Sequence, residues 1–393
     1  MSKETFISKR ITEIPAHPIQ KINEQAREME RSGEEVIHLE FGEPDFNTPR
    51  FIIEAAYKAM KAGYTKYTSG MGLIQLREAI SKKIWADCGV EVDPASEIVV
   101  LPGTKHAIYC ALMATVNPGD EVIITDPCYP PYEFAIKLVE GIPVRVPLKE
   151  SLDFRLDPKE LESKVTPKTK MILLNFPNNP TGSILTKEAI EALSEIVQRR
   201  NILVLSDEIY ENLIYNGEKF HSIISSSEMR DQTILVNGFS KTYAMTGWRL
   251  GYAVAPKVIA EKIRKVQENT TTCAPSFCQI AGVEALKKGR QFVNNMVREF
   301  NHRRQVLVHG LNKIRGVSCS MPKGAFYAFP NITELGVDDN KLSECLLKEA
   351  KVATVPGSAF GNQGHGHLRI SYANSVENIN KALEQIREAV EKL

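Results

Sequence analysis

Residues 171–210 read MILLNFPNNPTGSILTKEAIEALSEIVQRRNILVLSDEIY. Two continuous apolar runs, Met171–Phe176 and Ile202–Ser206, flank an amphipathic stretch at Lys187–Arg199. A continuous apolar run, rather than an alternating one, is typical of a strand that is covered on both faces. The segment therefore predicts a strand, a helix and a second strand, which is the repeating unit of a parallel sheet between helices.

The same rhythm extends to both sides of this segment. Further apolar runs that predict buried strands lie at Glu97–Leu101, Glu121–Thr125, Thr233–Val236 and Leu250–Val254. Helical patterns lie between them at Lys105–Val116 and Tyr132–Val139. We expect an α/β fold whose ligands bind outside the carboxyl ends of the strands.

The two ends of the chain have a different pattern. Helices are predicted at Pro18–Glu30, Gln291–Ile314 and Val376–Lys392, and short strands at Val36–Leu39, Ala325–Phe329 and His367–Tyr372. We expect residues 1–48, an N-terminal arm with part of the small domain, to join residues 288–393 in one smaller α+β domain. It would pack against a large domain at 49–287 and share a ligand cleft with it.

Composition excludes several classes of protein. The 393 residues include 49 Lys and Arg against 48 Asp and Glu, so the net charge of +1 predicts neither nucleic acid nor a membrane surface as partner. Seven cysteines without a C-x-x-C motif predict no disulfide framework, and no apolar run has the length of a signal peptide or membrane span. We expect a cytoplasmic protein without a metal, in which His365-Gly-His367 is a flexible surface loop and Arg303-Arg304 a solvated helix face.

Four polar features stand at the ends of predicted strands. They are Lys241 after Thr233–Val236, Asp207 after Ile202–Ser206, Asn179 in the turn 178–182, and Gly103 before the helix at Lys105. Each has an ordinary structural explanation: a solvated lysine, a helix cap, a tight turn and a single glycine junction. Because the strand ends meet at one edge of a sheet, we expect all four to face one cleft.

Together these features predict a cofactor. A lysine amine condenses with a carbonyl, a carboxylate can face a pyridinium nitrogen, and the free N–H groups at a helix start suit a phosphate. Pyridoxal 5′-phosphate carries all three of the matching groups.

From Gly42-Glu-Pro-Asp45 to Arg369-Ile-Ser-Tyr372, the sequence resembles the fold-type-I, class I aminotransferases that depend on pyridoxal phosphate, including bacterial and archaeal aspartate aminotransferases. The resemblance rests on the Asn-Pro-Thr-Gly turn, on Ser-Asp-Glu-x-Tyr210, and on Ser240-Lys241 with Arg249 eight residues later (249 − 241 = 8). It implies a large domain with a mostly parallel sheet of the seven-stranded type, a smaller α+β domain and a homodimer with shared sites.

The resemblance also implies roles at the cofactor. Lys241 would bond its aldehyde and move the proton at the substrate α-carbon, and Asp207 would keep the pyridine nitrogen protonated. Tyr210 and Asn179 would hydrogen-bond the 3′ oxygen, and Tyr129 would stack on the ring. The remaining implied cofactor contacts, at or near the phosphate, are Gly103, Thr104, Lys105, Ser240, Arg249 and, across the dimer interface, Tyr67.

For the substrate, the resemblance implies that Arg369 clamps the α-carboxylate beside Gly42, Tyr129 and Asn179. Lys105 stands where some aspartate aminotransferases carry a lysine near the distal carboxylate, so we expect aspartate and glutamate as amino donors and a 2-oxo acid such as 2-oxoglutarate as acceptor, in a ping-pong reaction. Lys105 facing solvent on the first helical turn is the alternative.

The sequence is also compatible with other functions. An aromatic or broad-specificity aminotransferase shares most of these motifs, and a pyridoxal-phosphate β-lyase or γ-replacement enzyme would use the same lysine and arginine. A regulator built on this fold would need an added DNA-binding module, and no basic segment precedes Gly42.

Overall fold

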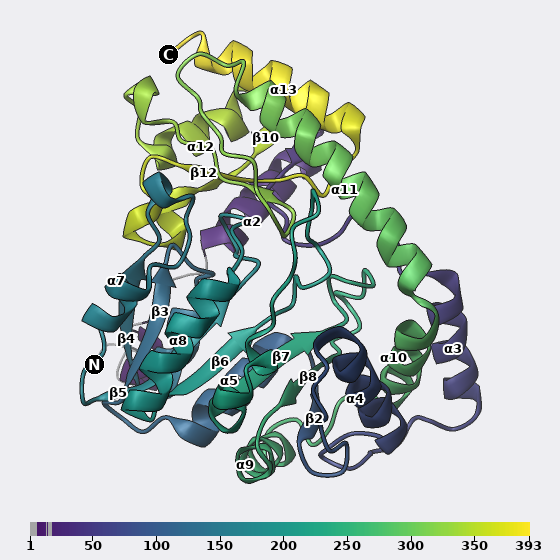
Figure 1. The fold of residues 1–393 in the computed structure, drawn as a ribbon. Coiled ribbons are helices and arrows are strands. Elements are labelled where there is room, and N and C mark those ends of the chain that lie inside the picture. The colour runs from purple at the N-terminus through teal and green to yellow at the C-terminus, as the bar shows by residue number, and fades with distance from the viewer. Residues whose placement is uncertain (1–5, 13, 15–17) are drawn as a thin grey trace.

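The computed structural model describes residues 6–12, 14 and 18–393; the first five residues and positions 13 and 15–17 of the predicted arm lie outside the described part. At its centre is a seven-stranded sheet with the strand order β2-β8-β7-β6-β5-β3-β4 (Figure 1). The strands are β2 (Ile98–Leu101), β3 (Glu121–Asp126), β4 (Ile142–Pro147), β5 (Thr169–Asn175), β6 (Leu203–Asp207), β7 (Thr233–Gly238) and β8 (Gly251–Val254). Strand β8 is antiparallel to both neighbours and the other pairs are parallel, which confirms the predicted α/β fold.

Helices cover both faces of this sheet. Val122 and Ile124 of β3 pack with one set of helices, whereas Ile123 between them packs toward the opposite face. This alternation explains the continuous apolar runs, because successive side chains point to opposite faces and both faces are buried. The helices are α3 (Arg50–Lys61), α4 (Ile74–Cys88), α5 (Thr104–Thr115), α6 (Pro131–Leu138), α7 (Pro158–Ser163), α8 (Lys187–Arg200), α9 (Lys257–Glu268) and α10 (Ser276–Lys288).

The prediction missed strand β4. This strand pairs only with β3 at the edge of the sheet, and its sequence IPVRVP carries two prolines and an arginine. Proline is tolerated at a sheet edge because its missing N–H faces away from the ladder, but it removes the apolar run that marks the inner strands.

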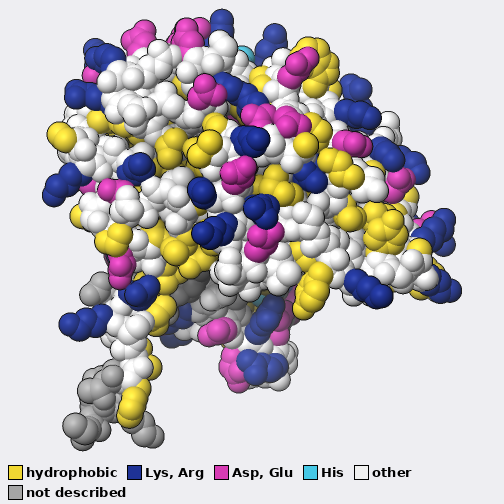
Figure 2. Space-filling model, turned by 90° about the horizontal axis from the view of Figure 1, so that it is seen from below, with side chains coloured by type: hydrophobic (Ala, Val, Ile, Leu, Met, Phe, Trp, Pro, Cys, Tyr) yellow, Lys and Arg dark blue, Asp and Glu magenta, His cyan; other side chains and the backbone are white. Residues whose placement is uncertain are grey.

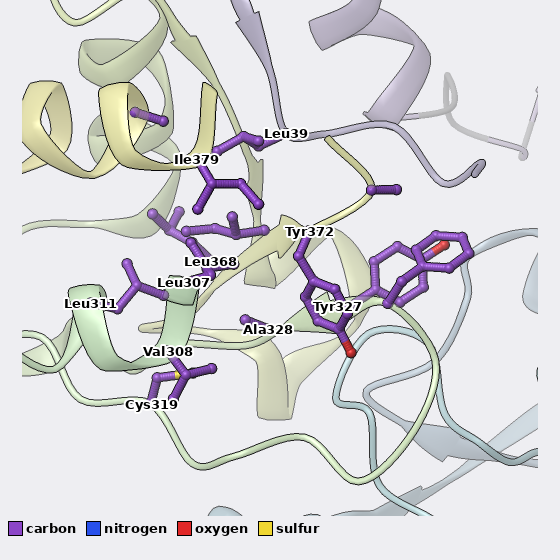
Figure 3. Close-up of a cluster of buried hydrophobic side chains, with 14 of the residues drawn as sticks. Leu39, Leu307, Val308, Leu311, Cys319, Tyr327, Ala328, Leu368, Tyr372 and Ile379 are labelled. Atoms are coloured by element: carbon purple, nitrogen blue, oxygen red, sulfur yellow. The ribbon is translucent and has the colours of Figure 1, made fainter. Parts of the chain in front are cut away.

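Both ends of the chain build the second lobe. Helix α2 lies among the C-terminal elements (Figure 1), and β1 pairs in parallel with β10. The elements of this lobe are α2 (Pro18–Arg31), β1 (Ile37–His38), α11 (Arg290–Leu311), β9 (Tyr327–Ala328), α12 (Asp339–Lys348), β10 (Val352–Ala353), β11 (Val355–Pro356), β12 (Leu368–Ser371) and α13 (Val376–Val390), and a short helix α1 (Lys9–Thr12) precedes them. Figure 3 shows part of the core of this lobe, in which Leu39 from the N-terminal segment meets Leu307, Leu368 and Ile379. The boundaries 1–48, 49–287 and 288–393 stay a prediction.

Two predictions about polar residues were wrong. The side chains of Arg303 and Arg304 are buried, because α11 packs against the rest of the lobe: Arg303 Nη1 donates to both carboxylate oxygens of Asp45 at 2.7 and 2.9 Å. His367 is also buried and its ring stacks on Phe329, with 4.8 Å between the ring centroids, whereas His365 is exposed.

The charged residues of the surface are mixed in sign. On the face shown in Figure 2, Lys and Arg side chains lie among Asp and Glu side chains, in keeping with the small net charge. In the described residues, no helix is both long and apolar enough to cross a membrane. The same residues contain no group of three or more His, Cys, Asp or Glu side chains suited to holding a metal ion.

Candidate active site

A cavity of about 440 Å³ opens between the two lobes at one edge of the large sheet. The carboxyl ends of the parallel strands supply most of its polar groups, with Asp207 at the end of β6 and Lys241 just beyond β7. Because β8 runs in the opposite direction, Arg249, which precedes it, reaches the same edge. The small lobe adds Arg369 from β12 and Tyr327 from β9.

The structure brings most of the predicted residues together. Those that line the cavity are Gly42, Thr104, Lys105, Tyr129, Asn179, Asp207, Tyr210, Ser240, Lys241, Arg249 and Arg369. Gly103 lies directly behind it, against the guanidinium of Arg249. Tyr67 lies apart within its own chain: it is 84 % exposed and lines a separate shallow depression with Tyr64 and Ser276.

Lys241 lines the cavity, and its amine is held there by a hydrogen bond. Its Nζ donates a hydrogen bond to the carbonyl oxygen of Gly42, so a large-lobe side chain is tied to the loop after β1. Removal from bulk water lowers the pKa of Lys241 to about 8, and the positive charges of Arg249 and Arg369 act in the same direction, while Glu43 and Asp207 oppose it. A substantial fraction of this amine is therefore neutral near physiological pH, which is the nucleophilic form.

Asp207 is a buried carboxylate without a cationic partner. It is 3 % exposed; Oδ2 accepts a hydrogen bond from the Tyr132 hydroxyl at 2.8 Å, and Oδ1 accepts one from the Ile209 N–H at 3.2 Å. Among the described residues, no Lys, Arg or His nitrogen lies within 4.0 Å of it, and burial raises the pKa of Asp207 to about 6. An ionised carboxylate in this position is costly unless a cation joins it, so the site suits a positively charged ligand atom.

Arg369 is a buried guanidinium without an anionic partner, as Asp207 is a buried carboxylate without a cationic one. It is 1 % exposed, and its Nη1 donates to Asn179 Oδ1 at 3.2 Å while Nη2 donates to the Glu40 carbonyl oxygen. Its Nε has no hydrogen-bond partner in the described structure, and none of the described carboxylates forms an ion pair with it. A guanidinium with an unused N–H donor is suited to binding a ligand carboxylate.

A second group of hydrogen-bond donors lies at the start of helix α5. Gly103 precedes the helix with a φ of +89°, and a Cβ there would collide with the guanidinium of Arg249. Glycine is therefore needed both for its backbone conformation and for the close approach of Arg249. The first N–H groups of a helix have no partner within it, so Arg249 and the amides near Thr104 together offer donors for a phosphate.

The sequence analysis missed several residues that line the cavity, and three of them hydrogen-bond to predicted site residues. Asn175 joins two motifs, because its Nδ2 donates to the Asp207 carbonyl oxygen at 3.0 Å and its Oδ1 accepts from the Asn179 N–H at 3.1 Å. Its polar side chain at the end of an apolar strand was a usable signal. Tyr132 and Tyr327 carried no such signal, since each lies inside a pattern that predicted a helix or strand and meets its partners only through the fold.

Comparisons with known proteins agree with this geometry. The family described as "Aminotransferase class I and II" matches residues 34–386. The chain is 41 % identical to an aspartate aminotransferase of Pyrococcus horikoshii over 391 residues, covering 99 % of this chain and 98 % of that protein. It is 40 % identical to aromatic-amino-acid aminotransferase 2 of Thermococcus litoralis, covering 98 % of each.

Solved structures give the same result. The aspartate aminotransferase of Thermus thermophilus with maleate superimposes with a TM-score of 0.93 at 37 % identity, covering 98 % of this chain and 99 % of that one. Matches of this identity and extent cover both lobes and the cavity between them. The chain thus belongs to the class I and II aminotransferase family and is an enzyme of amino-group transfer.

Proposed function

We propose that this aminotransferase uses pyridoxal 5′-phosphate and moves an amino group between an acidic L-amino acid and a 2-oxo acid in a ping-pong reaction. The observation that carries the proposal is the charge arrangement of the cavity: an unpaired buried carboxylate at Asp207, a partly neutral amine at Lys241, and anion sites at Arg249 and Arg369. A pyridinium nitrogen, an aldehyde, a phosphate and a substrate carboxylate are the groups that fit these positions.

In this proposal each residue has one task. The bound cofactor supplies an electron-withdrawing ring that stabilises negative charge at the substrate α-carbon. Asp207 holds the proton on the ring nitrogen, and Tyr132 and Ile209 hold Asp207. Lys241, whose pKa of about 8 lies close to physiological pH, would take the proton from the α-carbon and later return it.

The other cavity residues bind and orient. Arg369 and Asn179, already joined by a hydrogen bond, hold the α-carboxylate, and Tyr210 directs its hydroxyl to the cofactor 3′ oxygen. The ring of Tyr129 covers the cofactor. Arg249, Ser240 and the amides at Gly103, Thr104 and Lys105 bind the phosphate.

Lys105 supports an acidic substrate. Its ammonium lines the same cavity as Arg369 and stands 5.7 Å from the centroid of the Tyr129 ring. A dicarboxylate can therefore place one carboxylate on Arg369 and turn the other toward a second cation. The P. horikoshii and T. thermophilus relatives named aspartate aminotransferase support the same substrate class.

An aromatic substrate is the second candidate. Phe41, Tyr129, Tyr132 and Tyr327 give the cavity large apolar surfaces, and Lys105 is exposed at its edge, where an apolar side chain could displace it. The T. litoralis relative is named as an aromatic-amino-acid aminotransferase, which supports this second candidate.

Substitution of Lys105 separates the two candidates. Lys105→Met should lower kcat/KM for aspartate by about tenfold or more, since one charge pair in a partly dehydrated site contributes about 1–3 kcal/mol. Phenylalanine should change by less than about threefold, and the matched control Lys105→Arg should keep most of the aspartate activity because it keeps the charge. Equal losses for both donors, or a wild-type preference for phenylalanine, would contradict the acidic substrate.

We also propose that the enzyme is a cytoplasmic homodimer. Tyr67 and Tyr64 are exposed, and so are the apolar residues Ile53, Tyr57 and Met60 of the preceding helix α3. A second copy of the chain would cover exposed apolar side chains of this kind. In such a dimer, Tyr67 of each copy reaches the phosphate of the other. The seven free cysteines suit a reducing compartment.

A further inference from the structure

Two buried tyrosines meet across the lobes inside the cavity. The Tyr327 hydroxyl, at the start of β9 in the small lobe, lies 2.9 Å from the hydroxyl of Tyr210, which follows β6 in the large lobe. Their rings meet edge to face, with 5.8 Å between centroids and an interplanar angle of 81°. Figure 3 labels Tyr327 in the core of the small lobe, so its backbone is held by packing while its hydroxyl reaches the cavity.

Tyr327 also contacts the substrate side of the cavity. Its ring lies against Arg369, with 4.6 Å from the ring centroid to the guanidinium carbon. A Cβ on Gly42 would stand 2.9 Å from the Tyr327 hydroxyl oxygen, so the absence of a side chain at Gly42 leaves room for this hydroxyl. The Gly42 carbonyl in turn accepts the hydrogen bond from Lys241. One side chain therefore touches three elements of the site.

We propose that Tyr327 is a positioning residue that donates its hydroxyl proton to Tyr210 and thereby directs the proton of Tyr210 into the cavity, toward the 3′ oxygen of the cofactor. The proposal rests on the proposed function. A tyrosine hydroxyl has one proton, so Tyr210 can serve the cofactor only if it accepts, rather than donates, in its bond with Tyr327.

The surroundings of the pair favour this direction. The positive charge of Arg369 stabilises negative charge on the Tyr327 oxygen, which makes this hydroxyl the better donor of the two. A hydroxyl that accepts a hydrogen bond becomes a stronger donor itself, so the chain from Tyr327 through Tyr210 strengthens the bond to the 3′ oxygen. A stronger bond there would favour the anionic 3′ oxygen and lower the pKa of the Lys241 Nζ once it is bonded to the cofactor aldehyde carbon.

The test is a pH titration of the absorbance of the bound cofactor in the holoenzyme. Tyr327→Phe keeps the ring over Arg369 and should raise the midpoint by about 0.5–1 pH unit, as expected for one neutral hydrogen bond. Tyr210→Phe should raise it further, and Tyr210→Phe/Tyr327→Phe should match Tyr210→Phe alone, since Tyr327 acts through Tyr210. The control Tyr372→Phe removes a hydroxyl of the same core, which donates to the Ala325 carbonyl at 3.1 Å, and should leave the midpoint unchanged.

A second readout separates the ring from the hydroxyl. Binding of succinate, an unreactive dicarboxylate, should stay within about twofold in Tyr327→Phe and weaken about tenfold in Tyr327→Leu, which removes the ring from Arg369. A wild-type midpoint in Tyr327→Phe, or shifts that add in the double variant, would overturn the role of Tyr327 while leaving the proposed function intact. A wild-type protein that binds no titrating cofactor would overturn the proposed function itself.

Discussion

Replacing Asp207 by asparagine should make the cofactor-free protein more stable. Burial raises the pKa of Asp207 from 3.8 to about 6, although the hydrogen bonds from Tyr132 and Ile209 and the charge of Lys241 act in the opposite direction. Among the described residues, no cation lies within ion-pair distance of this carboxylate to offset the cost of burial. A carboxyl group whose pKa is raised by folding stabilises the fold below its unfolded pKa, and that contribution is lost as pH rises through the folded pKa. At pH 8 the ionised carboxylate therefore costs stability.

The size of the effect follows from the shift. About two pKa units correspond to about 3 kcal/mol, at 1.36 kcal/mol per unit. Asparagine removes the charge but provides one oxygen where the carboxylate provides two, so one of the bonds from Tyr132 and Ile209 weakens at a cost of about 1 kcal/mol. The net stabilisation expected for the apoprotein of Asp207→Asn at pH 8 is about 2 kcal/mol, and it should decrease toward zero on going to pH 5.

The assay is urea unfolding of the apoprotein at pH 8 and pH 5, with the midpoint as the measured quantity. Asp126→Asn is the matched control: Asp126 is also buried at a strand end, but it has Arg145 Nη1 at 3.8 Å and accepts the N–H groups of Asn362 and Gln363, so its substitution should destabilise. In the holoenzyme, Asp207→Asn should lose turnover by orders of magnitude. A lower midpoint for Asp207→Asn at pH 8, or the same difference at both pH values, would refute the reasoning.

Two further predictions concern the small lobe and the dimer. The hydrogen bond with Glu40 (2.7 Å) raises the pKa of His38 above 6.5, so the charged form of His38 stabilises the fold at low pH, and this stabilisation is lost as pH rises through the raised pKa. His38→Gln should therefore lower the urea midpoint more at pH 6 than at pH 9. Equal losses at the two pH values would count against this ion pair. Tyr67→Ala and Lys241→Ala, each inactive alone, should regain about a quarter of wild-type activity when they are dissociated and mixed. Half of the randomly re-formed dimers are hybrids, and one of the two sites in each hybrid is intact. Activity that stays at the level of the separate variants would exclude the shared site.

The sequence predicted the inner strands of the large sheet and the residues at their ends for one physical reason. A strand covered on both faces must be apolar throughout, so a polar residue such as Asp207 directly after it is conspicuous and is placed at the sheet edge by the topology alone. The edge strand β4 does not need to be apolar throughout, and its two prolines interrupt the apolar pattern by which the inner strands were predicted.

Residues whose roles depend on lobe packing could not be predicted. Tyr327 and Tyr132 reach the cavity through contacts with Tyr210 and Asp207, which lie 117 and 75 residues away in the chain. Arg303 was predicted to be solvated because charged pairs on a helix usually face water, but Asp45 compensates its charge from the loop that follows β1. The sequence around Tyr327, Tyr132 or Arg303 does not indicate a partner so far away in the chain.

The pairing of β1 with β10 has a consequence for biosynthesis. Ile37 is synthesised before every strand of the large sheet, yet its partner Val352 emerges from the ribosome only after the whole of that sheet has been synthesised. The N-terminal strand must therefore stay unpaired while the large lobe folds, and its contacts close a loop of very high sequence separation, which is slow to form. A chain stopped before β10 should fold its large sheet and leave α2 and β1 open to protease, whereas the complete chain should protect both.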